Sequence, residues 1–209
     1  MRRRPNGTTA QAPAPALIAA PLLAVLAVLA AFAVSAPAAA RRPDVGVGVG
    51  RTLAVKDGPG GGGVSLRLSL LWRVEDHVRV GMMAFADGLG ERTERLIGPG
   101  GVDLGPVAGV HRAAQGAAVR LEAHLPGGHA LEPYVAATWG FYRVEDDVRG
   151  ARLGSDDAAG FGLGVGFLRP FNDHHAAGVA LRAQQLSRGA AGRYLSAGLE
   201  WRWSMGAGD

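Results

Sequence analysis

From Val45 to Trp203 the chain is built of stretches of about ten residues in which apolar side chains alternate with small, polar or charged ones. The alternation is clearest over Val64–Val74 and Arg193–Trp203. Successive side chains of a β-strand point to opposite faces, so a period of two predicts strands. No segment of useful length after residue 40 has the period of a helix. The pattern therefore predicts an all-β protein.

Turn residues divide this region into eight predicted strands. Short turns such as Glu75-Asp76 alternate with longer connections, chiefly Asp87–Gln115 and Glu145–Asp157, which we interpret as loops. Extra strand around Val107–Arg112 is the alternative for the first of them. Short turns on one side and long loops on the other are typical of an up-and-down barrel. The predicted strands are Val45–Val55, Val64–Val74, His77–Ala86, Gly116–Leu125, Leu131–Val144, Ala158–Phe171, Ala176–Leu186 and Arg193–Trp203.

The two faces of these strands differ in composition. In the second strand one face carries Val64, Leu66 and Leu68, and the other carries Ser65 and Arg67. A soluble, lipocalin-like barrel would turn the apolar face inward around a ligand. The opposite face is rich in glycine, alanine and serine, which suits the narrow inside of an eight-stranded barrel better than a water-facing sheet. We therefore expect the apolar face to point outward, into a membrane.

The N-terminal segment has the features of an export signal. Three arginines at positions 2–4 precede an apolar run from Ala16 to about Val34, and Ala38-Ala39-Ala40 follows as a small-residue cleavage site. We predict a signal peptide over 1–40 and a single barrel domain over 41–209, with a retained membrane anchor as the alternative. The predicted leader contains three arginines and no acidic residue, so 22 basic and 18 acidic residues become 19 and 18. This balance, with no cysteine in the chain, excludes a disulfide scaffold and gives no basic patch for nucleic acid.

Aromatic residues and glycines in the C-terminal half carry a family resemblance. Pro133–Gly140, Ala159–Gly166 and Tyr194–Trp203 resemble the small eight-stranded outer-membrane β-barrel proteins, which include the opacity-like proteins and the transmembrane domain of outer membrane protein A. The resemblance covers about Leu131–Trp203 and implies a Gram-negative outer-membrane location, partners in membrane lipid and lipopolysaccharide, and insertion by the barrel-assembly machinery. Tryptophans on the apolar face predict aromatic belts at the membrane interfaces: Trp72, Trp139, Trp201 and Trp203.

Charged residues on the small-residue face are expected to meet in the lumen. Unpaired charges are costly in a narrow space, so we predict a hydrogen-bonded network that fills the barrel, with an anion-preferring, porin-like pore as the alternative. Function would then reside in the loops 87–115 and 145–157, with an unidentified extracellular ligand. The predicted network comprises Arg67, Arg73, Arg79, Arg120, Glu122, Glu132, Arg182, Glu200 and Arg202.

Other candidate chemistry is weaker. Adjacent His174 and His175 lie in a predicted turn and do not converge as histidines one helical turn apart do, so we expect no metal site. The glycines of Gly160–Gly166 do not lead from a strand into a helix, so no nucleotide cofactor is expected. A lipid-modifying enzyme would need a serine with a histidine base, and no serine has one nearby in sequence. We expect no catalysis; a soluble periplasmic binder and a lipid-modifying enzyme remain the alternatives.

Overall fold

The computed structural model describes residues 43–54, 62–125, 130–187 and 192–205. The predicted signal peptide lies outside these ranges. Within them no helix has the length and hydropathy needed to cross a membrane. The elements are β1 (Asp44–Ala54), β2 (Gly63–Glu75), β3 (Val78–Ile97), the 3-10 turn η1 (Pro99–Gly101), β4 (Asp103–His124), β5 (Glu132–Val148), β6 (Ala151–Pro170), β7 (His175–Leu186) and β8 (Arg193–Ser204).

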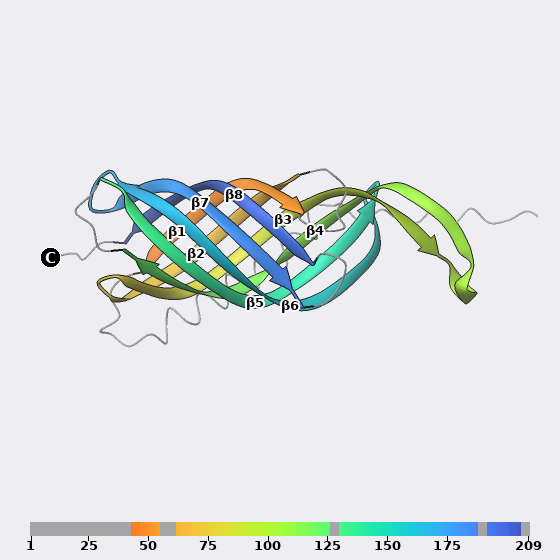
Figure 1. The fold of residues 1–209 in the computed structure, drawn as a ribbon, viewed down its shortest axis with the longest axis horizontal. Helices are drawn as coiled ribbons and strands as arrows, with labels where there is room; N and C mark the ends of the chain where they lie inside the picture. Colours follow the sequence, from red (N-terminus) through yellow and green to blue (C-terminus); the bar gives the residue numbers. More distant parts are fainter. Residues whose placement is uncertain (1–42, 55–61, 126–129, 188–191, 206–209) are drawn as a thin grey trace, which may run out of the picture.

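The eight strands form one closed antiparallel barrel in the order of the sequence (Figure 1). Each strand pairs with its neighbours in the chain, and β1 closes the barrel by pairing with β8, with Val49 opposite Leu199. A closed ladder leaves no free sheet edge in the barrel wall. The predicted fold class is confirmed, and each of the eight predicted strands overlaps one strand of the barrel.

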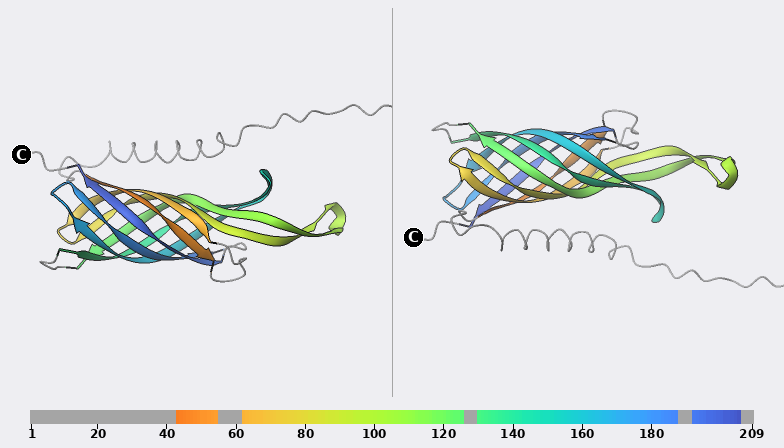
Figure 2. Two further views of the ribbon diagram at one scale, coloured as in Figure 1. Left: turned by 90° about the horizontal axis from the view of Figure 1, so that it is seen from above. Right: turned by 90° about the horizontal axis from the view of Figure 1, so that it is seen from below.

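The barrel has two different ends, which Figure 2 shows from two sides. The short-turn end carries the β2–β3 and β6–β7 turns, and both β1 and β8 meet there because Asp44 pairs with Ser204. The opposite end, called here the hairpin end, carries long extensions of β3–β4 and β5–β6.

The faces of the wall follow the predicted alternation. Apolar side chains at alternate positions point outward and are exposed, as for Leu163 (63%) and Leu199 (65%), whereas Ser65, Ser69 and Ser196 are buried inside. Large aliphatic side chains along the outer wall are therefore about half exposed at successive outward positions. Exposing such a continuous apolar surface to water would be unfavourable. The expected outward orientation of the apolar face is confirmed.

The predicted loop Asp87–Gln115 is wrong. β3 continues to Ile97 and β4 begins at Asp103, and the two pair with each other throughout. β2 leaves β3 at Asp87, and β5 joins β4 at Val110, whose partner on β3 is Arg92. Residues 93–109, called here the arm, therefore form a two-stranded ribbon that projects beyond the barrel (Figure 1). The alternative prediction of extra strand around Val107–Arg112 is confirmed, because β4 includes these residues.

The predicted loop Glu145–Asp157 is also wrong. β5 runs to Val148, β6 starts at Ala151, and only Arg149 and Gly150 connect them. Both connecting residues have positive φ, 52° and 80°, as a tight hairpin turn of the mirror-image type requires. This hairpin is charged on both faces because both faces lie beyond the apolar band, so its strands lack the alternation that sequence analysis uses.

Glycines in β6 make room for large side chains inside the barrel. A Cβ at Gly160 would lie 2.9 Å from the ring of Tyr142, and one at Gly166 would overlap the ring of Tyr134. The repeated Gly-X-Gly pattern of this strand thus marks the inner surface against which two tyrosines pack.

Candidate functional site

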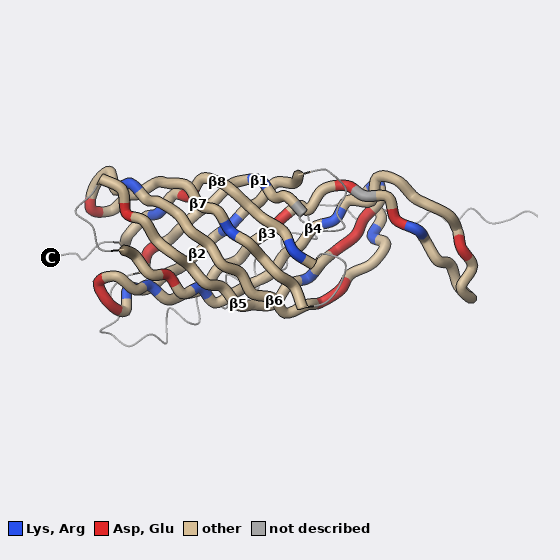
Figure 3. Tube along the Cα trace, viewed as in Figure 1, with Lys and Arg blue, Asp and Glu red and all other residues tan. Residues whose placement is uncertain are grey.

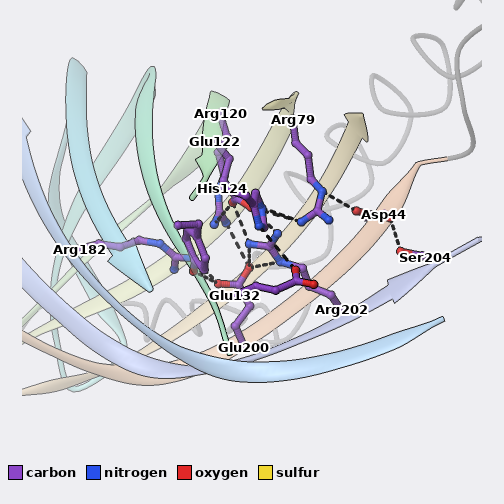
Figure 4. Close-up of polar contacts among 11 residues, drawn as sticks. Asp44, Arg79, Arg120, Glu122, His124, Glu132, Arg182, Glu200, Arg202 and Ser204 are labelled. Atoms are coloured by element: carbon purple, nitrogen blue, oxygen red, sulfur yellow. Dashed lines mark hydrogen bonds and ion pairs between the residues drawn. The ribbon is translucent and has the colours of Figure 1, made fainter. Parts of the chain in front are cut away.

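The lumen near the short-turn end is filled by an ion-pair network centred on two carboxylates (Figure 4). Glu200 on β8 is buried, and its oxygens accept hydrogen bonds from Arg202 (2.9 Å), Arg182 (2.9 Å) and the Tyr134 hydroxyl (2.7 Å). Arg120 on β4 reaches the same carboxylate at 3.4 Å. Four strands are thereby tied together across the lumen at one side chain.

Glu122 is the second centre. Its side chain is fully buried, Arg202 binds both of its oxygens, and Arg120 lies 2.6 Å from Oε2. Arg202 bridges the two carboxylates and stacks over the Tyr134 ring at 4.8 Å. Such bidentate, charge-assisted contacts are the strong form of hydrogen bond, and they cross-link β4 to β8 through the middle of the barrel.

Asp44 and Arg79 extend the network to the mouth at the short-turn end. Arg79 Nε lies 3.0 Å from Asp44 Oδ2, and Asp44 also accepts a hydrogen bond from Ser204. On its other side, Arg79 Nη1 is 2.7 Å from His124 Nε2, whose ring stacks on Tyr134. The first and last strands are therefore joined by side chains as well as by the ladder.

A second polar group lies farther toward the hairpin end. Asp87 is buried and accepts hydrogen bonds from Ser65 (2.6 Å) and Tyr194 (2.9 Å). Arg67 approaches Asp87 at 3.3 Å and donates to the Ser196 hydroxyl at 2.6 Å.

Apolar side chains pack around Asp87 and close the lumen at this level. Phe85 packs on Tyr142 with ring centroids 4.6 Å apart, and Met83, Leu89 and Leu186 complete the buried cluster. The barrel is thus filled by an ion-pair network toward the short-turn end, and by an apolar cluster that encloses Asp87 toward the hairpin end.

The structure brings together seven of the nine residues predicted for the lumen network, at positions 67, 79, 120, 122, 182, 200 and 202. Arg73 does not join them: it is exposed and lines a cavity of about 220 Å³ at the short-turn end. Glu132 lines the same cavity and is 41% exposed, and its Oε2 lies 3.7 Å from His124 Nδ1. Both have the inward register but lie at strand ends, where the lumen opens to solvent.

Two buried carboxylates were missed by the sequence analysis. Asp87 was assigned to a loop, although it has the parity of Arg79 and Phe85 and would have been found by extending the third strand. Asp44 stands one residue before the predicted first strand. Asp87 pairs with Arg67, and Asp44 pairs with Arg79. The predicted network contained both arginines but neither of these acidic partners.

The predicted interface tryptophans lie at different heights on the outer wall. Trp201 and Trp203 are half exposed near the short-turn end, where Phe171 stacks on Trp201 at 5.8 Å. Trp72 lies near the same end of β2. Trp139 lies farther toward the hairpin end and packs edge-on against Phe141 at 5.4 Å. The aromatic side chains thus occur toward both borders of the apolar band.

The arm carries exposed apolar side chains outside the barrel wall. Around the glycine turn η1, the side chains of Ile97, Val102 and Leu104 are about 60% exposed. Behind them, Arg95 pairs with Asp103 at 2.7 Å across the two strands. The arm ends in an aliphatic tip that contains one charged residue, Asp103, and further charged residues lie along its strands (Figure 3).

Ion pairs stabilise the β5–β6 hairpin. Arg112 binds Asp146 through two hydrogen bonds of 2.7 and 2.6 Å. On the exposed surface Arg143 binds Asp157 at 2.8 Å, and this hydrogen bond lowers the pKa of the Asp157 carboxyl and raises the pKa of Arg143. Both charges lie beyond Phe141, outside the apolar band.

The histidines of the β6–β7 turn and of the lumen make other contacts and do not come together as a group of metal ligands. Asn172 accepts hydrogen bonds from the backbone N–H groups of His174 and His175, and the His175 ring packs on Trp201. His124 belongs to the lumen network. Among the residues that the structure describes, no group of three or more histidines and carboxylates is arranged to hold a metal ion.

An eight-stranded antiparallel barrel with an aliphatic outer wall, aromatic borders and a charged interior defines the class of membrane-spanning β-barrels. The family model of the outer membrane protein beta-barrel domain matches residues 24–202. The chain therefore belongs to this family and is a protein of the bacterial outer membrane.

Solved structures share the fold. Neisserial surface protein A is 12% identical, with a TM-score of 0.57 over 78% of this chain and 96% of that one. The N-terminal β-barrel domain of OprF from Pseudomonas aeruginosa is 16% identical, with a TM-score of 0.50 over 78% of this chain and 98% of that one. No curated protein matches the sequence.

Proposed function

We propose that this protein is a closed, non-catalytic outer-membrane barrel that presents the arm as a recognition element at the cell surface. The observation that carries the proposal is the combination of a filled lumen with an arm whose aliphatic tip is exposed. A rigid scaffold holding a protruding binding element is a common arrangement for recognition. In this orientation the short-turn end faces the periplasm.

The filled lumen supports a barrel that does not conduct. Glu200 and Glu122 with their arginines fill it toward the short-turn end, and the cluster around Phe85 and Tyr142 fills it toward the hairpin end. Purified protein in planar bilayers should give no stable conductance steps. Reproducible anion-selective steps would contradict the closed barrel and favour a pore.

Ser204 on β8 and His111 on β4 each have a carboxylate partner in place of one another, which supports a non-enzymatic function. Ser204 donates to Asp44, and His111 on β4 lies 3.3 Å from Glu91. We propose that lipid A analysed by mass spectrometry is identical with and without the protein. A change in its acyl chains would favour the lipid-modifying alternative.

We propose that the tip of the arm contacts an apolar partner outside the cell. Burying three aliphatic side chains that are each about 60% exposed would contribute a few kcal/mol, at about 25 cal/mol per Å² of apolar surface. Cells carrying the protein should adhere to octyl-coated beads. The triple variant Ile97→Ser, Val102→Ser, Leu104→Ser should lose this adhesion.

The matched control is Leu153→Ser, at an exposed aliphatic position (41%) on the β5–β6 hairpin, which should leave adhesion unchanged. An epitope inserted between Gly100 and Gly101 should be labelled on intact cells. Labelling only after lysis, or equal adhesion of the triple variant, would refute surface recognition by the arm.

We also propose that outer-membrane lipid, including lipopolysaccharide in the outer leaflet, covers the aliphatic wall between the aromatic borders, and that the barrel-assembly machinery inserts the chain. The wall offers the continuous hydrocarbon surface that lipid tails require. Extraction from membranes should need detergent, and the folded protein should change its gel mobility on boiling. Release by salt alone would favour the soluble binder.

A further inference from the structure

One cation stands alone on the outer wall near the short-turn end. Arg169 has the outward register of β6, next to the half-exposed Phe167, and its side chain is exposed. At the outward positions within 159–169 of β6, 175–183 of β7 and 195–203 of β8, it is the only arginine, lysine or carboxylate. It forms no ion pair with any residue that the structure describes. Its charge is therefore available to an anion from the surroundings of the barrel.

Aromatic rings lie beside Arg169 on the same face of the wall. Phe171, the next outward residue, stacks on Trp201 of β8, and the ring of His175 lies 5.6 Å from Trp201. His175 also stacks on Trp203, at an interplanar angle of 14°. We call these four rings the shelf. Phe171, Trp201 and Trp203 are each about half exposed, so the outer side of the shelf is open to a ligand.

A small residue separates Arg169 from the shelf. Arg169 pairs with Ala177 of β7 in the sheet register, and Ala177 pairs with Trp201 of β8. Neighbouring strands lie about 4.8 Å apart, so the backbones at Arg169 and Trp201 are separated by about 10 Å. Ala177 is partly exposed and offers only a methyl group between the two longer side chains. The register therefore places a shallow seat between a cation and an indole ring.

We propose that this surface binds the headgroup of one glycerophospholipid in the membrane leaflet at the short-turn end. The guanidinium of Arg169 donates hydrogen bonds to the phosphodiester oxygens, a pairing for which its planar fork is well suited. The glycerol and the first part of an acyl chain lie over Ala177 against the shelf, because indole rings favour the level of the headgroups. The inference rests on the proposed covering of the wall by lipid, and it does not depend on the arm.

The order of side chains along β6 supports a lipid as the occupant. From the short-turn end toward the middle of the barrel, the outward positions carry Arg169, then Phe167 and Val165. A lipid of this leaflet has its phosphate at the membrane border and its hydrocarbon farther in, so charge meets charge and apolar surface meets apolar surface. A free phosphate ion would use the single cation and none of the apolar surface.

Native mass spectrometry of the full chain, released from detergent micelles, tests the site. With dioleoyl phosphatidylethanolamine as the probe, we expect the wild type to retain one lipid molecule. Dioleoylglycerol, which has the same chains and no phosphate, should not be retained. Arg169→Gln should weaken binding about tenfold, as expected for the loss of a hydrogen bond between charged groups. Ala177→Phe keeps every charge but fills the seat, and it should weaken binding as well.

The matched control is Arg193→Gln, which removes an exposed outward arginine at the hairpin end, away from the shelf, and should leave lipid retention unchanged. The gel mobility without boiling shows that each variant is folded. Equal retention by Arg169→Gln and the wild type, or equal retention of dioleoylglycerol, would overturn the proposal. Displacement of the lipid by excess inorganic phosphate would identify a site for the free ion and overturn the assignment to lipid.

Failure of this site and failure of the lipid-covered wall have different results. A barrel that needs detergent for extraction but retains no phospholipid would refute the site alone. A chain that salt releases from membranes would refute the lipid covering, and with it the site.

Discussion

Removal of the negative charge of Glu200 should be among the most damaging single changes in the barrel. Glu200→Gln preserves the shape of the side chain but leaves Arg120, Arg182 and Arg202 facing a neutral amide. Glu122 then still pairs with Arg120 and Arg202, but Arg182 loses its ion pair with Glu200.

The magnitude follows from the burial and the number of donors. Glu200 is 3% exposed and accepts hydrogen bonds from three arginines and from Tyr134. Removing one partner of a buried ion pair typically costs about 3–5 kcal/mol, because the remaining charge stays buried without compensation. We expect a loss of about that size in the free energy of unfolding, since the four contacts act as one unit and do not add.

Urea unfolding of the refolded barrel in micelles, followed by tryptophan fluorescence and by gel mobility without boiling, measures this loss. Combining Glu200→Gln with Arg182→Met restores the charge difference, so the double variant should recover about 1–3 kcal/mol relative to additive effects. A loss below about 1 kcal/mol, the size expected for an exposed pair, would show that the lumen around Glu200 is hydrated and would refute the filled barrel.

Three further changes test other parts of the structure. Gly166→Ala should destabilise the barrel by about 1–3 kcal/mol, since the new methyl group overlaps a tyrosine ring, whereas Gly154→Ala, with open space around it, should not; urea midpoints compare them. Leu163→Arg, on the lipid-facing wall, should cost about 2–4 kcal/mol in lipid vesicles, and no change there would mean that the wall contacts water. The hydrogen bond from Arg143 lowers the pKa of Asp157, so the pair persists at neutral pH and is lost as the pH falls through this lowered pKa. Carboxyl NMR should show Asp157 titrating at a higher pH in Arg143→Gln than in the wild type. An unchanged titration would exclude the hydrogen bond in solution.

The barrel could be predicted because one face of each strand meets hydrocarbon and the other meets a narrow interior. Because of this contrast, apolar and polar residues alternate with a period of two in segments such as Val64–Val74. The lumen residues followed from the same parity, as Arg120 and Glu200 illustrate. Arg73 and Glu132 lie on the inward face of their strands, but at strand ends where the lumen opens to solvent. The alternation of residues identifies the inward face and does not indicate how far along the barrel axis the lumen stays closed.

The arm could not be predicted from periodicity. Register shifts between Gly88 and Gly90, between Arg92 and Glu94, and at Leu96 reset the alternation three times within one strand. Glycines with positive φ, such as Gly105, interrupt the partner strand. Both faces of a two-stranded ribbon in water are also exposed, so no burial contrast selects apolar residues for one side.

The central claim is that the aliphatic outer wall contacts lipid, and spin labelling along β6 tests it most directly. The native chain has no cysteine, so single cysteines at Phe161, Leu163 and Val165 can each carry one label in lipid vesicles. The structure predicts that these labels are reached by oxygen dissolved in the bilayer and shielded from a water-soluble nickel reagent, whereas a label at Arg152 is reached by the nickel reagent. Free access of the nickel reagent to Leu163 would contradict a membrane-spanning barrel.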